Sequence, residues 1–137
     1  MSDTKDHEVL DSAGVLPAEL PFAGAVRHGD TLYLSGQIGN QPGTLRLVEG
    51  GIRAEARQAI ANIATILTAR GVGLRDVIRC TVMLADMEDW PAFNDVWREE
   101  WPSPFPARSA FGCWGLALGA RVEIECTAAL PNRPTAR

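Results

Sequence analysis

Hydrophobic and polar residues alternate early in the chain, and this spacing predicts strands. Residues 31–34 alternate threonine and tyrosine with leucine, as a half-buried strand does. Glycines and a proline at 39–43 then indicate a turn, so residues 44–48 are expected to form the returning strand of a hairpin.

Two later segments have helical spacing instead. Apolar residues recur every three or four positions from Ala56 to Leu67, and Gly71 is expected to end this helix. Asp89 is the expected N-cap of a second helix, which Pro102 stops. The apolar stripe of this second helix consists of Trp90, Phe93 and Trp97.

Two longer strands complete the predicted fold, at residues 75–86 and 120–130. Alternation along the last strand separates one set of side chains (Val122, Ile124, Cys126) from another (Glu123, Glu125, Thr127). The element order β-β-α-β-α-β-β predicts an α+β domain of two layers, with two helices on one face of a mixed sheet.

The second face of this sheet is expected to be a subunit interface. Arg79, Thr81 and Met83 share one face of the strand at 75–86, and a methionine fits an interface better than open water. A single helical layer also leaves half of the sheet uncovered, and homo-oligomerisation is the usual way to cover it.

The pattern predicts one domain over residues 15–131, with an N-terminal tail at 1–14 and a C-terminal tail at 132–137. The start is acidic and lacks the apolar region of a secretory signal, so a cytoplasmic location is expected. No apolar run approaches the ~18 residues that a membrane span needs. A net charge of −4 argues against nucleic acid or anionic lipid as a partner.

Few residue types for metal or nucleophilic chemistry occur in useful spacing. Three widely separated cysteines and two histidines near the N-terminus predict neither a metal site, a disulfide framework nor a hydrolytic triad. Phosphate-loop and dinucleotide motifs are missing from the sequence as well.

Arg108, in the segment FPARSAFGCWG, is the most conspicuous candidate. It is either a surface or interface arginine paired with a glutamate, or an anion receptor whose planar guanidinium matches a carboxylate. A turn at 115–119 is expected to bring Ser109 and Glu123 near it, where a carboxylate could orient water and carry protons.

Several segments resemble the RidA/YjgF family of reactive-intermediate deaminases, among them LYLSGQIG, FPARS and RVEIECTAAL. The similarity runs from about Pro21 to Leu130. It implies a chorismate-mutase-like fold and a homotrimer with sites between subunits. It also implies hydrolysis of 2-enamine or 2-imino acids, such as 2-aminoacrylate and 2-iminobutanoate, to 2-keto acids and ammonia, with no cofactor.

The resemblance assigns roles to individual positions. Arg108 matches the arginine that holds the substrate carboxylate, and Glu123 matches the acid that orients the attacking water. Ser35 and Asn94 match pocket residues, and Ser109 follows the arginine as in the family. Two positions depart from the pattern: Phe22 stands where the family commonly has tyrosine, and Ala110 stands where it commonly has cysteine.

Two alternatives to deamination stay open at this point. A trimer of the same fold could bind small carboxylates without catalysis, or act on a different metabolite. A ribonuclease role, which is sometimes attached to relatives, is disfavoured by the acidic charge.

Overall fold

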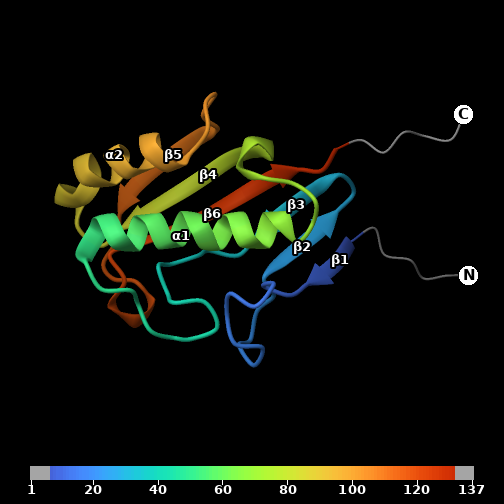
Figure 1. The fold of residues 1–137 in the computed structure, drawn as a ribbon, viewed down its shortest axis with the longest axis horizontal. Coiled ribbons are helices and arrows are strands. Elements are labelled where there is room, and N and C mark those ends of the chain that lie inside the picture. Colours follow the sequence, from blue (N-terminus) through green and yellow to red (C-terminus); the bar gives the residue numbers. More distant parts are fainter. Residues whose placement is uncertain (1–6, 132–137) are drawn as a thin grey trace, which may run out of the picture.

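The computed structural model describes residues 7–131, which form one sheet with helices on one side of it (Figure 1). The strands are β1 (His7–Leu10), β2 (Ala25–His28), β3 (Thr31–Leu34), β4 (Val77–Leu84), β5 (Ala107–Gly112) and β6 (Val122–Ala129). The helices are α1 (Gly51–Thr68) and α2 (Trp90–Glu100), with short 3-10 turns at Leu74–Asp76, Met87–Asp89 and Ala117–Gly119. The mixed α+β architecture with two helices is therefore confirmed within the described residues.

The strands lie in the order β1-β2-β3-β6-β4-β5. All neighbours are antiparallel except β4 and β5, which are parallel. The last strand in sequence, β6, therefore lies inside the sheet, and β5 lies at its edge. Because β4 separates them, β5 and β6 are not direct neighbours, although they follow one another along the chain.

Both helices pack on one face of this sheet through apolar side chains. The stripe of α1 is buried as its spacing predicts, and comprises Ala56, Ala59, Ile60, Ile63, Ile66 and Leu67. It meets the inward-facing residues of β3, β4 and β6 in one core cluster. Gly71 follows α1 with a φ of +79°, a left-handed conformation that suits glycine, and this confirms its expected place at the end of the helix.

The predicted element order is wrong at the N-terminal end, where the described residues from His7 onward form three strands before α1. His7–Leu10 forms β1 within the expected tail, and Ala25–His28 forms β2. The pattern misses β1 because only Leu10 of its four residues is buried, so the strand depends on its ladder with β2. Residues 1–6 of the tail predicted at 1–14, and the whole tail predicted at 132–137, lie outside the described residues.

The expected returning strand at 44–48 is also wrong. This segment contributes only an isolated bridge between Asn40 and Leu47. The Thr44 side chain donates to the carbonyl of Gln41 at 2.8 Å, which favours a local turn over an extended ladder.

Asp89 stands in the N-cap position of α2, but its side chain makes no capping hydrogen bond. It pairs instead with Arg121 at 2.9 Å. The capping carboxylate lies one turn earlier, where Asp86 accepts from the backbone N–H of Glu88 at 2.9 Å. The 3-10 turn at Met87–Asp89 explains this shift, because it already occupies the backbone groups that precede α2.

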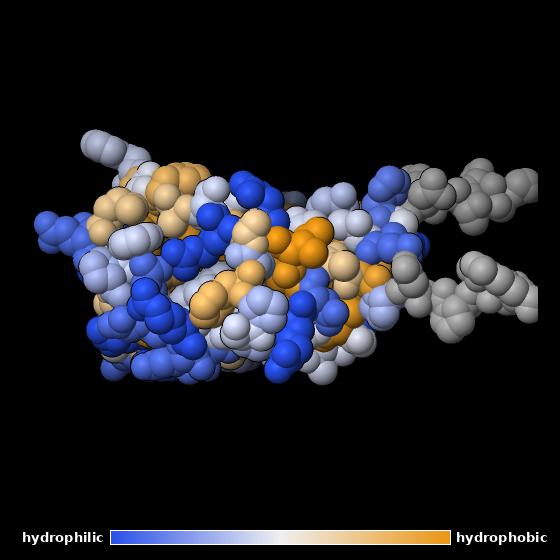
Figure 2. Space-filling view, turned by 90° about the horizontal axis from the view of Figure 1, so that it is seen from above, coloured by the Kyte–Doolittle hydropathy of each residue, from blue (hydrophilic) through white to orange (hydrophobic). Residues whose placement is uncertain are grey.

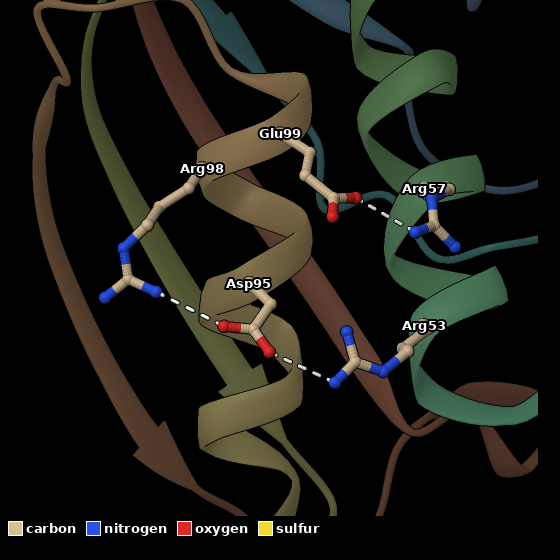
Figure 3. A network of polar contacts seen from close by, with 5 residues as sticks. All are labelled: Arg53, Arg57, Asp95, Arg98 and Glu99. Carbon is tan, nitrogen blue, oxygen red and sulfur yellow. Dashed lines mark hydrogen bonds and ion pairs between the residues drawn. The ribbon is translucent and has the colours of Figure 1, made fainter.

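Exposed ion pairs join α1 to α2 on the outer surface (Figure 3). Arg53 bonds Asp95 at 3.1 Å, and Arg57 bonds Glu99 at 3.0 Å. Arg98 also reaches Asp95, at 3.4 Å. Solvent screens such pairs, so the apolar core supplies most of the helix packing energy.

The face of the sheet away from the helices carries the second set of β6 side chains. The alternation predicted for β6 is confirmed, since Val122, Ile124 and Cys126 are buried and Glu125 is exposed. Tyr33 and Phe111 lie on this open face and are exposed. The sheet thus presents a mixture of carboxylates and large apolar side chains on this side.

Hydrophilic side chains cover much of the surface seen from above, and hydrophobic ones form small groups between them (Figure 2). Neither helix of the described chain has the combination of length and apolar character that crossing a membrane requires.

Candidate functional site

Arg108 lies on the edge strand β5 and points to the side of the sheet that carries the helices. It is opposite the buried Cys80 of β4, and side chains at paired positions share a face. Its Nη2 donates to Oδ1 of Asn94 in α2 at 2.7 Å. The guanidinium carbon lies 4.9 Å from the ring centre of Trp97 and 5.5 Å from that of Phe93. We call these four residues (Arg108, Asn94, Trp97, Phe93) the Arg108 cluster.

The charge of Arg108 has no carboxylate partner among residues 7–131. Burial lowers the pKa of the guanidinium, and the positive charge of Arg98 also lowers it, whereas Cys80 acts in the opposite direction. An arginine nevertheless stays protonated at neutral pH. A half-buried cation that bonds only a neutral amide is suited to receive an anion from outside.

Glu123 begins the open-face row of β6, opposite Met83 of β4. Its carboxylate lies directly against Gly36, so close that a Cβ at position 36 would collide with Oε2. Two backbone hydrogen bonds between Gln37 and Ile124, of 2.8 and 2.9 Å, hold these segments together. Burial raises the pKa of the Glu123 carboxyl, and the neighbouring Glu125 raises it further.

Ser35 lies beside this contact in the chain, and its side chain bonds the segment that contains Phe22. Ser35 precedes Gly36, and its hydroxyl donates to the carbonyl of Ala23 at 2.6 Å. The adjacent Phe22 is exposed and lines an open cavity of about 290 Å³. We call Glu123, Gly36 and Ser35 the Glu123 cluster.

The two predicted catalytic side chains lie on opposite faces of the sheet. Arg108 is on the helix side, Glu123 is on the open side, and β4 separates their strands. Each side chain is held in its own cluster by local contacts, so the two clusters are separate places in one chain.

The other predicted residues of β5 divide between these faces. Ala110 shares the helix side with Arg108, two positions further along the strand. Ser109 points to the open side, where its hydroxyl accepts a 3.4 Å hydrogen bond from Arg79. Ser109 therefore faces away from Arg108 within one chain, and the expectation that its segment neighbours that of Glu123 is wrong, because β4 lies between β5 and β6.

Sequence reasoning missed the aromatic rings around Arg108 and the role of Gly36. Helical spacing marks Trp97 as a core residue but does not indicate a cation above it. Sequence reasoning also missed the contact between the free thiols of Cys80 and Cys126. These cysteines are 46 residues apart in sequence, and their sulfurs lie 3.3 Å apart. No group of three His, Cys, Asp or Glu side chains in residues 7–131 is arranged to hold a metal ion.

Comparison with known proteins relates this geometry to a family. A family model described as Endoribonuclease L-PSP matches residues 14–130. A 2-iminobutanoate/2-iminopropanoate deaminase from Capra hircus is 44% identical over 120 residues, which are 88% of this chain and 88% of the relative.

Solved structures agree with this match. RidA from the Antarctic bacterium Psychrobacter has a TM-score of 0.84 and 35% identity, over 90% of this chain and 99% of its own. TdcF from E. coli, solved with bound serine, has a TM-score of 0.82 and 26% identity, over 90% of this chain and 99% of its own. The family match over nearly the whole fold, together with relatives of this identity and coverage, shows that the chain belongs to the RidA/YjgF family.

Proposed function

We propose that this protein is a hydrolytic deaminase of 2-imino acids, with Arg108 holding the substrate carboxylate and Glu123 directing water. The observation that carries the proposal is the state of Arg108, a half-buried cation with a neutral partner, Asn94, at 2.7 Å. The activity named for the Capra hircus relative supports it, as does the amino acid bound to TdcF.

The reaction balances with water alone. The water oxygen attacks C2 of the imine and forms a C–O bond, while the C=N π electrons move to nitrogen, which takes up a proton. The resulting carbinolamine then loses its hydroxyl proton as the C–N bond breaks. The products are a 2-keto acid and ammonia. An enamine such as 2-aminoacrylate first takes a proton at C3 to become the imine.

Two side chains of this chain suit these steps. Arg108 binds the substrate carboxylate and so positions C2 for attack by water. This positioning lowers the entropic cost of the reaction. Glu123 accepts the proton from water and returns it to the departing nitrogen. Its raised pKa favours that exchange, since a base that holds its proton more tightly than an ordinary carboxylate is better matched to neutral pH.

Ser35, Phe22 and Ala110 line the remaining walls in this proposal. Ser35 holds the chain segment before Gly36 in place through its bond to Ala23. Phe22 supplies apolar area without a phenolic hydroxyl. Ala110 puts a methyl group beside Arg108 on the same face of β5.

The complete site would form between copies of the chain, in a homotrimer. Arg108 and Glu123 lie on opposite faces of one sheet, so an Arg108 cluster of one copy must meet a Glu123 cluster of another. Exposed Tyr33 and Phe111 on the open face give such an assembly apolar area to bury.

The test is an assay in which a dehydratase generates 2-aminoacrylate or 2-iminobutanoate and semicarbazide traps the imine. The protein is expected to accelerate keto-acid release, and Arg108→Ala is expected to abolish the acceleration. Arg46→Ala, at an exposed position, is the matched control and should keep it.

Two results would contradict the proposal. Carboxylate binding at Arg108 without any acceleration would make the protein a binder. RNA cleavage by purified protein that persists in Arg108→Ala at ~150 mM salt would favour a nuclease.

A further inference from the structure

A cleft of about 310 Å³ opens beside the Arg108 guanidinium. This volume lies at the lower end of the range for small-molecule sites, roughly 300–1,000 Å³. Three of its walls are aromatic, from Trp90, Trp97 and Phe105. The polar groups at its rim are Arg108, Asn94 and Arg98.

The three aromatic rings differ in what already covers them. Trp97 is buried, and the Arg108 guanidinium lies 4.9 Å from its ring centre. Trp90, the first residue of α2, is 41% exposed, and Phe105, just before β5, is 50% exposed. Two large apolar side chains are thus uncovered on a cleft that also contains an unneutralised cation.

The charges at the rim favour an anion at Arg108 rather than at Arg98. Arg98 has a carboxylate neighbour, Asp95, at 3.4 Å. Within the part of the chain that the structure describes, Arg108 bonds only the amide of Asn94. A ligand that fits both features has one carboxylate for Arg108 and an apolar group that covers Trp90 and Phe105.

We infer that the preferred substrates are 2-imino acids with an aromatic or large branched side chain, and that Trp90 and Phe105 determine this preference. The inference rests on the proposed deaminase function and specifies its substrate class. A methyl side chain, as in 2-iminopropanoate, leaves both rings in water. A benzyl side chain removes apolar area of ligand and protein from water together, which favours binding.

The experiment compares two imines made by one enzyme. D-amino-acid oxidase with catalase converts D-alanine to 2-iminopropanoate and D-phenylalanine to 2-imino-3-phenylpropanoate, and semicarbazide traps what remains. The value of kcat/KM for the phenyl substrate is expected to exceed that for the methyl substrate by about tenfold or more, as hydrophobic pockets typically discriminate. Trp90→Ala and Phe105→Ala are each expected to lower this ratio by about tenfold.

Leu45→Ala is the control, because Leu45 is 46% exposed and does not line this cleft. It should leave the ratio unchanged. A ratio of one or below in the unmodified protein would overturn the inference, as would an equal fall in Leu45→Ala. A change of oligomeric mass in Trp90→Ala or Phe105→Ala with an unchanged ratio would show that the rings bind a second copy, and would overturn it too.

Product binding separates this inference from the proposed function. Calorimetry with phenylpyruvate and pyruvate needs no turnover, and phenylpyruvate is expected to bind about tenfold more tightly in an Arg108-dependent way. Tighter phenylpyruvate binding without turnover of either imine would support the preference of the cleft for an aromatic carboxylate and refute the deaminase. Turnover of both imines with equal binding of both keto acids would support the deaminase and refute the preference for aromatic substrates.

Discussion

The Arg108 guanidinium is oriented by Asn94 at 2.7 Å, through a neutral amide in place of a carboxylate. This hydrogen bond fixes the direction of the cation without cancelling its charge. The proposed grip on a substrate carboxylate depends on both properties.

Asn94→Asp should therefore raise KM without a matching loss of kcat. The new carboxylate would neutralise Arg108 and compete with the substrate anion, and the expected rise in KM is about tenfold. The measurement is steady-state kinetics in the imine assay. Glu99→Gln, also in α2, removes a carboxylate that pairs with Arg57 on the outer surface and should leave KM close to its original value. An unchanged KM in Asn94→Asp would contradict the role given to the neutral partner.

Gly36→Ala should lower kcat, because its Cβ would displace the Glu123 carboxylate. A shift of about 1 Å in a catalytic group typically reduces the rate roughly a hundredfold. Gly73→Ala is the matched control, since a Cβ at Gly73 meets open space. In the Gly36→Ala background, Glu123→Asp shortens the side chain and relieves the collision. The two substitutions are therefore expected to be non-additive, and strict additivity would refute the direct contact.

The pH dependence of kcat/KM should reflect the raised pKa of Glu123. Burial and Glu125 both disfavour the charged form, so activity is expected to fall on acidification at a higher pH than it would with an ordinary glutamate. Glu125→Gln removes the second cause and should move this acid limb to lower pH. An acid limb that stays in place in Glu125→Gln would remove Glu123 from the proton transfer.

The raised pKa of Glu123 also makes the stability of the fold depend on pH. A carboxyl whose pKa is higher in the folded chain binds its proton more tightly there, so its contribution to stability is lost as pH rises through the folded pKa. Glu123→Gln is therefore expected to gain stability relative to the original protein as the pH is raised. Denaturant unfolding at several pH values measures this difference, and a constant difference would be inconsistent with the raised pKa.

The ion pairs between α1 and α2 are expected to contribute little to stability. Arg53→Ala should change the free energy of unfolding by no more than about 1 kcal/mol, because solvent screens its pair with Asp95. Ile63→Ala, in the buried stripe of α1, should cost about 2–5 kcal/mol. Denaturant unfolding at fixed protein concentration compares the two. A larger loss in Arg53→Ala would reverse this view of the helix interface.

The spacing of apolar and polar residues predicted those elements of the fold whose burial follows from local periodicity. The stripe of α1, the alternation along β6 and the glycine at 71 all follow from nearest neighbours in sequence. The family resemblance named Arg108 and Asn94 separately as pocket residues, and the structure joins them through a 2.7 Å hydrogen bond. The polar edge strand β1 was missed because its stability comes from the ladder with β2 rather than from its own pattern.

The arrangement of the site depends on pairing between strands that are far apart in sequence. The spacing of residues along the chain does not predict such pairing. The register of β5 and β6 on β4 places Arg108 and Glu123 on opposite faces, because Arg108 is paired with Cys80 and Glu123 with Met83. The contact of Gly36 with Glu123 depends on the bridge between Gln37 and Ile124, which joins segments far apart in sequence.

The most direct test of the account mixes two variants that are each expected to be inactive, Arg108→Ala and Glu123→Gln. If the working site joins Arg108 of one subunit to Glu123 of the next, each mixed trimer regains one intact site of three. Random co-assembly after unfolding and refolding the mixture should then restore about a quarter of the original imine-hydrolysing activity. Activity that stays at the level of the separate variants, in a mixture shown by mass spectrometry to contain mixed trimers, would contradict a site shared between subunits.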